Sequence, residues 1–165
     1  MPGMDDFKGV LATIRKQTGL EMLVPDDEGL VTFRVDDKYN VCFQYIEGTG
    51  KVLCFVEICE LPPSAGVAVY RDLLAGSLFG RETAGGYFAL EPKSNIILYN
   101  CLFDFDPANT DPKGFAERLE SILQLVEIWA ERIRTSVGVN PGEEMDGEDI
   151  TVEALRGNSV SFFRP

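Results

Sequence analysis

Between Leu30 and Cys59 the chain reads LVTFRVDDKYNVCFQYIEGTGKVLCFVEIC, in which apolar and polar residues largely alternate. Alternation with a period of two is the pattern of a strand that buries one of its faces. The turn-forming residues after Val35 and after Ile46 divide this stretch into three strands that follow one another as a meander. We expect these strands at residues 30–35, 39–46 and 51–59.

A helix is expected on each side of this meander. Before it, residues 5–17 place Phe7, Val10, Leu11 and Ile14 at helical spacing. After it, Ser64 follows two prolines and is the expected N-cap of a second helix that ends before Gly80. One apolar stripe of this second helix is expected to comprise Val67, Tyr70, Leu73, Leu74 and Leu78.

A hairpin and a long helix complete the pattern. The hairpin strands are expected at residues 87–90 and 96–105, separated by the turn that begins at Glu91. Asp111 and Pro112 are typical of an N-cap and a first helical residue. The following helix has apolar residues at spacings of three and four, namely Phe115, Leu119, Ile122, Val126, Trp129 and Ile133.

The predicted order is α-β-β-β-α-β-β-α, an α+β fold with a five-stranded, mostly antiparallel sheet and three helices. We expect residues 1–137 to form this domain and residues 138–165 to form a mobile, acidic tail. The third and fifth strands are apolar on both faces. Either helices and a second copy of the chain cover this apolar surface, or part of it is an open groove for a partner.

Composition excludes several classes of partner. The chain has 15 basic and 27 acidic residues and a net charge of −12, which repels nucleic acids and anionic membranes. With no apolar stretch long enough to span a bilayer and no signal-peptide pattern, the protein is expected to be cytoplasmic and not inserted in a membrane. The cysteines, Cys42, Cys54, Cys59 and Cys101, are expected to be buried thiols.

Histidine and two common binding motifs are missing from the chain. The chain has no histidine, which removes the usual activation of a serine or cysteine nucleophile. The glycine-rich segment from Gly80 to Gly85 lacks the Lys-Ser/Thr pair of a phosphate-binding loop. The acidic residues of segment 104–111 lack the spacing of a calcium loop, so they are expected to end a strand and cap a helix. We therefore expect a binding protein without cofactor, metal or catalytic residues.

Two motifs lie in the second helix and in the hairpin that follows it: residues 73–80 read LLAGSLFG, and residues 83–98 read TAGGYFALEPKSNIIL. Both resemble the Tir chaperone family of class I type III secretion chaperones. The family commonly shows Leu-Leu-x-Ala-Asn-Leu on its second helix, then Gly-Gly-x-Leu-x-Leu-Asp-Pro and a Val-x-Leu strand. Here Gly76 and Ser77 replace Ala-Asn, and Glu91 replaces the aspartate, while the apolar positions are kept. Element order, size and acidity extend the resemblance over about residues 4–137.

The resemblance implies a cytoplasmic homodimer that holds the N-terminal segment of a secreted effector extended and ready for export. A regulatory protein of the same fold without an export client is the alternative. By analogy, the dimer interface is expected to include Tyr70, Leu74, Leu78, Tyr87 and Phe88. The effector-binding groove is expected to include Phe33, Val35, Val41, Phe43 and Phe55, although ordinary core packing would explain any one of them.

Overall fold

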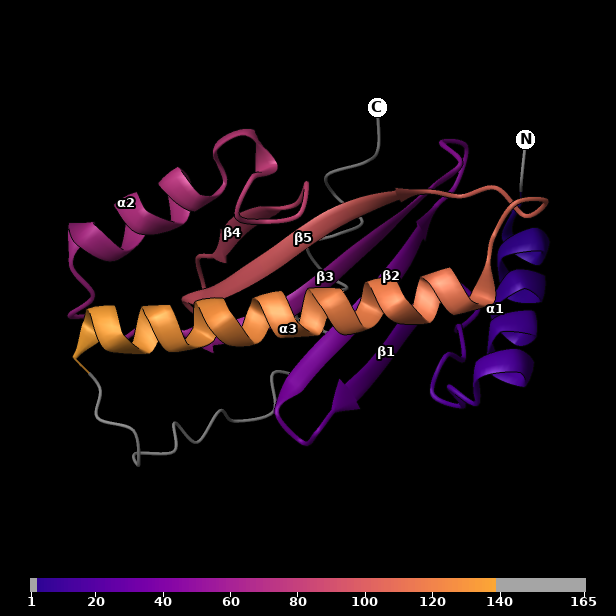
Figure 1. Cartoon of the computed structure of the whole chain (residues 1–165), viewed down its shortest axis with the longest axis horizontal. Coiled ribbons are helices and arrows are strands. Elements are labelled where there is room, and N and C mark those ends of the chain that lie inside the picture. Colours follow the sequence, from indigo (N-terminus) through magenta and orange to yellow (C-terminus); the bar gives the residue numbers. More distant parts are fainter. Residues whose placement is uncertain (1–2, 139–165) are drawn as a thin grey trace.

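The computed structural model describes residues 3–138, in which one antiparallel sheet has three helices packed on the same face (Figure 1). The helices are α1 (Met4–Thr18), α2 (Val67–Gly76) and α3 (Pro112–Val137), and a 3-10 turn, η1 (Leu78–Gly80), follows α2. The strands are β1 (Leu30–Val35), β2 (Tyr39–Ile46), β3 (Lys51–Glu60), β4 (Tyr87–Glu91) and β5 (Ile96–Asp104). The predicted α+β class and order of elements are confirmed.

The sheet has the order β1-β2-β3-β5-β4, and every neighbouring pair is antiparallel. The first turn of the meander has left-handed backbone at Asp36 and Asp37, each with a φ of 52°, which brings Val35 opposite Tyr39. The meander is therefore confirmed, and the later hairpin of β4 and β5 is joined to it through β3 and β5. This arrangement leaves β1 and β4 as the two edges of the sheet.

The long helix α3 crosses the sheet from end to end, with α1 near its first turns and α2 near its last (Figure 1). Asp111 caps α3 by accepting hydrogen bonds from the backbone N–H groups of Lys113 and Gly114, as the sequence predicted. The buried stripe of α3 comprises Leu119, Ile122, Val126, Trp129, Ala130 and Ile133. Each helix buries part of its surface in one continuous core with the inner face of the sheet.

The second helix differs from its prediction in two ways. Its N-cap is Gly66 and not Ser64, and it ends at Gly76, so Leu78 belongs to the separate turn η1. The buried residues of α2 are Val69, Leu73 and Gly76. Of the predicted apolar stripe, only Leu73 is buried; Tyr70 is half-buried, and Val67, Leu74 and Leu78 are exposed. Glycine at position 76 shifts the buried stripe, because α3 approaches α2 at that residue.

The outer face of the sheet, opposite the helices, has a smaller apolar cluster of Leu30, Cys42 and Phe55 with Leu53. Of the four cysteines, Cys42, Cys54 and Cys101 are buried and Cys59 is half-buried, and all four are free thiols. Burial raises the pKa of Cys42 and of Cys59 to about 11, so both are protonated at neutral pH. The predicted tail comprises residues 138–165; Gly138 is the C-cap of α3, and residues 139–165 lie outside the described residues.

Candidate functional site

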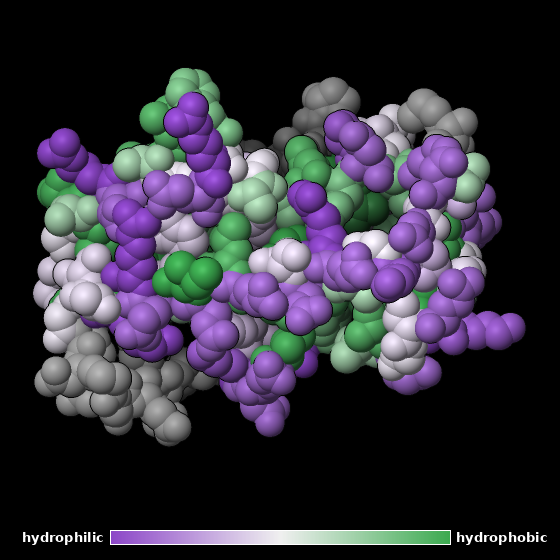
Figure 2. Space-filling view, viewed as in Figure 1, coloured by the Kyte–Doolittle hydropathy of each residue, from purple (hydrophilic) through white to green (hydrophobic). Residues whose placement is uncertain are grey.

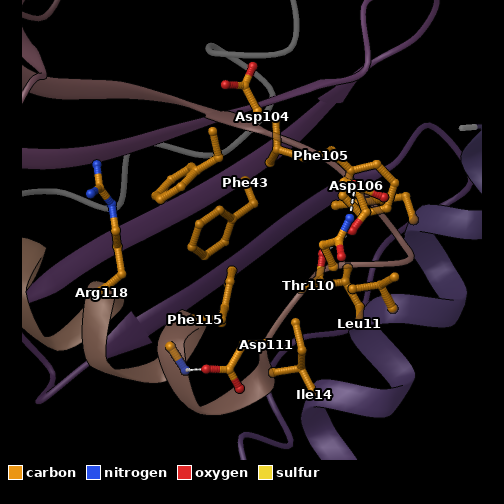
Figure 3. Close-up of a pocket in the computed structure, with 16 residues that line it drawn as sticks. Leu11, Ile14, Phe43, Asp104, Phe105, Asp106, Thr110, Asp111, Phe115 and Arg118 are labelled. Carbon is orange, nitrogen blue, oxygen red and sulfur yellow. Dashed lines mark hydrogen bonds between the residues drawn. The ribbon is translucent and has the colours of Figure 1, made fainter. Parts of the chain in front are cut away.

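An apolar pocket of about 420 Å³ opens between α1, the first turns of α3 and the end of β5 (Figure 3). Its size lies within the range in which proteins bind small apolar groups, about 300–1,000 Å³. Its apolar lining comes from α1, strands β2, β3 and β5, the segment that follows β5, and α3, namely Phe7, Val10, Leu11, Ile14, Phe43, Val52, Phe103, Phe105 and Phe115.

The amphipathic stripe of α1 and the start of α3 create this pocket. Phe7, Leu11 and Ile14 face the core from α1, whereas Phe115 projects from the first turn of α3. Between them Phe43 of β2 lies with its ring centroid 5.4 Å from that of Phe115. Helices α1 and α3 approach the sheet from different directions. Aromatic rings line the space between these helices but do not fill it.

The mouth of the pocket is charged. Asp104, Asp106 and Asp111 line it together with one basic residue, Arg118, whose guanidinium carbon lies 5.1 Å from the ring centroid of Phe103. An apolar interior with three carboxylates and one guanidinium at its rim can take up an apolar side chain, and it favours basic neighbours beside that side chain.

Local hydrogen bonds fix these carboxylates. The side-chain amide of Asn109 and the backbone N–H of Ala108 donate to Asp106 and hold the pKa of that carboxyl below its ordinary value. Asp111 is the N-cap of α3, and Asp104 pairs with Lys51 at 2.9 Å. The acidic residues of segment 104–111 thus end a strand, form a turn and cap a helix, as predicted. Among residues 3–138 no group of three or more His, Cys, Asp or Glu side chains is placed to hold a metal ion.

The structure does not bring the predicted groove residues together on one surface. Phe33, Val41 and Phe43 are buried on the inner face of the sheet, and Val35 is half-buried there. Phe55 belongs to the cluster on the outer face. Only Phe43 lines the pocket. The role of these five residues in binding a partner stays a prediction, and in this structure four of the five side chains serve as core.

A second candidate surface lies at the other end of α3. Six of the ten large hydrophobic residues that are exposed in the described part of the chain fall between residues 67 and 90, which concentrates them on α2, η1 and β4. Figure 2 shows hydrophobic side chains at the upper left, where Figure 1 draws α2. We call this group the α2 surface; its members are Val67, Leu74, Leu78, Phe79, Tyr87 and Leu90.

Three of the five predicted interface residues belong to the α2 surface, namely Leu74, Leu78 and Tyr87. The other two, Tyr70 and Phe88, are half-buried and pack against the core. Phe79 was not predicted, although it is 83 % exposed and has a left-handed φ of 58°. A phenylalanine in a turn that ends at a glycine is the signal that sequence reasoning could have used.

The pocket residues of α1 and α3 were also missed. The sequence marked both helices as amphipathic, but helical spacing does not show that two apolar stripes leave a gap where they meet. None of the described helices is both long and apolar enough to cross a bilayer.

Several solved structures resemble this fold. A chain of the ExsC–ExsE complex matches with a TM-score of 0.66 and 17% identity, covering 81% of this chain and 97% of that one. A chain of the HopA1–SchA chaperone–effector complex gives a TM-score of 0.63 with 18% identity over 76% of this chain and 94% of that one. The Yersinia pestis type III secretion chaperone SycH, solved with a fragment of YscM2, gives 0.57 with 19% identity over 74% and 98%. At such identities the likeness concerns the fold.

Comparison of the sequence identifies the family as well as the fold. The Chlamydia pneumoniae protein CPj0713/CpB0740 is 36% identical over 105 residues, which span 63% of this chain and 77% of that protein. The profile of the Tir chaperone protein (CesT) family matches residues 9–130, which include α2 and β4, where the motifs lie, and most of α3. Because this match spans well over half of the chain, the protein belongs to the Tir chaperone protein (CesT) family.

Proposed function

We propose that this protein is a type III secretion chaperone that binds a segment of a secreted effector and keeps it extended for export. The observation that carries the proposal is an open, ring-lined pocket in a member of a chaperone family. An extended segment can place an apolar side chain in such a pocket without any catalytic step. The solved chaperone–effector complex of HopA1 and SchA and the SycH complex supply the analogy.

The charge of the chain supports a client of a particular kind. A net charge of −12 and the three carboxylates at the pocket mouth favour an effector segment with basic residues beside its apolar ones. The free edge β1 offers backbone groups with which an extended client can pair. The proposal places client binding in residues 1–137, in the cytoplasm and without enzymatic activity, and leaves the acidic segment 138–165 outside the binding domain.

The α2 surface is the proposed contact between two copies of the chain. Leu74 and Phe79 are 73 % and 83 % exposed, and monomeric proteins rarely leave such a concentration of large apolar side chains in water. A two-fold contact that covers α2, η1 and the adjoining part of β4 would bury most of these side chains in both copies. The pocket lies at the opposite end of α3, so a dimer formed in this way keeps both pockets open.

Co-expression tests the client. The full chain should be produced with the N-terminal segments of candidate effectors encoded beside it, and the mass of the purified complex measured by light scattering. We expect a dimer of twice 18.3 kDa that retains one effector segment. Phe115→Ala, in the pocket, should weaken retention, whereas Ile128→Ala, on the exposed face of the same helix, should not. If both variants retained the effector segment equally well, the pocket would not be the binding site. If the wild-type chain captured no effector segment, the result would favour a regulatory protein without an export client.

A double substitution tests the dimer. Leu74→Asp with Leu78→Asp places charges on the α2 surface and should yield a folded monomer, because both side chains are exposed and bury little core. The circular dichroism spectrum and thermal midpoint check that the chain is folded. A variant that remains dimeric would move the contact to another surface.

A further inference from the structure

Helix α2, which presents much of the α2 surface, is weakly built by itself. It has 10 residues, no side-chain cap at Gly66, and only Val69, Leu73 and Gly76 in the core. Helices of this length are marginal in water and depend on contacts with the rest of the protein. The orientation of α2 is therefore set by its contacts with α3.

The side-chain hydrogen bonds described between α3 and α2 come from one arginine of α3. The Nε of Arg132 donates to Asp72 Oδ2 at 2.6 Å, and its Nη2 donates to Asp72 Oδ1. Its Nη1 donates to Glu82 Oε2 at 2.8 Å, in the loop that follows η1. A planar guanidinium that pairs with one carboxylate through two N–H groups fixes direction as well as distance. Arg132 thus joins α3 to α2 and to the loop at the same time.

The single tryptophan lies beneath this arginine and orders the same region. The guanidinium carbon of Arg132 lies 4.3 Å from the ring centroid of Trp129, and Trp129 Nε1 donates to the carbonyl oxygen of Glu82 at 3.2 Å. The indole also packs against Phe88 of β4, with ring centroids 4.6 Å apart, and against Gly76, where a Cβ would come within 2.3 Å of it. Helix α2, the loop after η1 and strand β4 therefore meet at Trp129 and Arg132.

We propose that Arg132 is a positioning residue for the contact between two copies: it sets the orientation of α2 and η1 and thereby the affinity of the dimer. The inference rests on the proposed dimer. Arg132 acts through Asp72, Glu82 and Trp129, and it need not touch the partner. We name Asp72, Glu82, Trp129 and Arg132 the Arg132 network.

The exposure of the network separates this role from a general contribution to stability. The side chains of Arg132, Asp72 and Glu82 are 42 %, 31 % and 56 % exposed, and ion pairs this exposed contribute little to the free energy of unfolding. Loss of Arg132 should therefore leave the core of the sheet and α3 intact. Its effect should appear where two α2 surfaces must match, because a small change of helix orientation disturbs every contact across a two-fold axis.

The test compares Arg132→Ala and Arg132→Lys with Arg134→Ala in the full chain. Arg134 is the matched control, because it lies two residues away on α3 and pairs with Glu131 of the same helix. Sedimentation gives the dissociation constant of the dimer, and the emission of Trp129, the only tryptophan, reports on the network. Asp72→Asn, alone and combined with Arg132→Ala, shows whether the two residues act as a unit.

We expect Arg132→Ala to raise the dissociation constant about tenfold, which is about 1.4 kcal/mol, and to shift the emission of Trp129 to longer wavelength. Arg132→Lys should give a smaller increase, since an ammonium does not reproduce the paired N–H groups. Arg134→Ala should match the wild type, and the double variant should be no weaker than Arg132→Ala alone. The difference between wild type and Arg132→Ala should shrink as salt rises.

Two outcomes overturn the inference, and they are distinguishable. A dimeric wild type whose affinity is unchanged by Arg132→Ala would refute the positioning role and leave the dimer proposal standing. A wild type that stays monomeric at high concentration would refute the dimer proposal, and the inference with it.

Discussion

Phe43 and Phe79 have the same side chain at opposite ends of the molecule. Phe43 lies beside the first turns of α3, where it is 1 % exposed and packs against Phe33, Phe103 and Phe115. Phe79 lies in η1, after α2, where it is 83 % exposed. Apolar residues at the first end enclose a pocket, whereas those at the second end face the solvent.

The lengths and contacts of the helices explain the difference. α1 has 15 residues and buries Phe7, Leu11 and Ile14 against the sheet and α3, so the apolar residues of the first end are covered within one chain except at the pocket. α2 has 10 residues and its contact with α3 is centred on Gly76, which leaves one side of α2 uncovered. The comparison teaches that equally apolar segments divide into core and binding surface according to how much helix is available to cover them.

The largest effect that we expect comes from truncating the two phenylalanines. Phe43→Ala removes a ring from the core and should lower the free energy of unfolding by about 3–5 kcal/mol, whereas Phe79→Ala should change it by no more than about 0.5 kcal/mol. Urea unfolding of dilute protein measures both, because dilution removes the contribution of association. Equal losses would show that Phe79 is covered within one chain and would break the comparison.

A glycine substitution tests the contact at the second end. Gly76→Ala would place a Cβ 2.3 Å from two ring carbons of Trp129, and this buried indole is held by Phe88 and by its hydrogen bond to Glu82. We expect a loss of about 1–3 kcal/mol in urea unfolding, as for other overpacked cores.

The matched control is Gly9→Ala in α1, where no atom lies within 4 Å of the added Cβ. There the better helix propensity of alanine should raise the free energy of unfolding by up to about 1 kcal/mol. Opposite signs for the two substitutions would confirm that the indole takes the space at Gly76. A stabilising Gly76→Ala would mean that α2 can move away from α3.

Much of this fold was predictable because its signals are local. The alternation from Val31 to Tyr45 and the spacing of apolar residues along α3 depend on neighbours in the chain, and both predictions are confirmed. The buried face of α2 was predicted wrongly. Its four leucine and valine residues, Val67, Val69, Leu73 and Leu74, look equally apolar in sequence, and the approach of Trp129, 53 residues after Gly76, decides which side is covered.

The candidate site was less predictable for the same reason. Leu74, Leu78 and Tyr87 were selected through the family motif and are exposed as a contact surface requires, but their role in a dimer stays a prediction. Phe33 and Val41 were selected by analogy with the family, and the sequence did not show that both side chains are buried in the core. Pattern identifies which side chains are apolar, and only the packing of distant segments decides which of them remain open to a partner.

The smallest effect that we expect concerns Glu57, whose charged side chain lies on the outer face of the sheet. The prediction tests whether partial burial changes the free energy of unfolding there, as burial does at the two ends of the molecule. Glu57 accepts a hydrogen bond from Asn40 Nδ2 at 2.6 Å, yet burial raises the pKa of its carboxyl. A pKa that is higher in the folded chain than in the unfolded chain means that the charged form disfavours folding. The fold is therefore most stable, as far as Glu57 is concerned, below the ordinary carboxyl pKa, and loses stability as pH rises through the ordinary and then the raised value.

Glu57→Gln removes that charge and keeps an oxygen that can accept from Asn40. At pH 7 it should raise the free energy of unfolding by no more than about 0.5 kcal/mol, and the gain should vanish below the ordinary carboxyl pKa, where the wild-type group is neutral in both states. Glu60→Gln, exposed at the end of the same strand, is the control and should change little at either pH. If Glu57→Gln raised the free energy of unfolding equally at both pH values, the cause would be packing and not charge. The outer face around Glu57 would then behave as part of a packed core and not as a solvated surface.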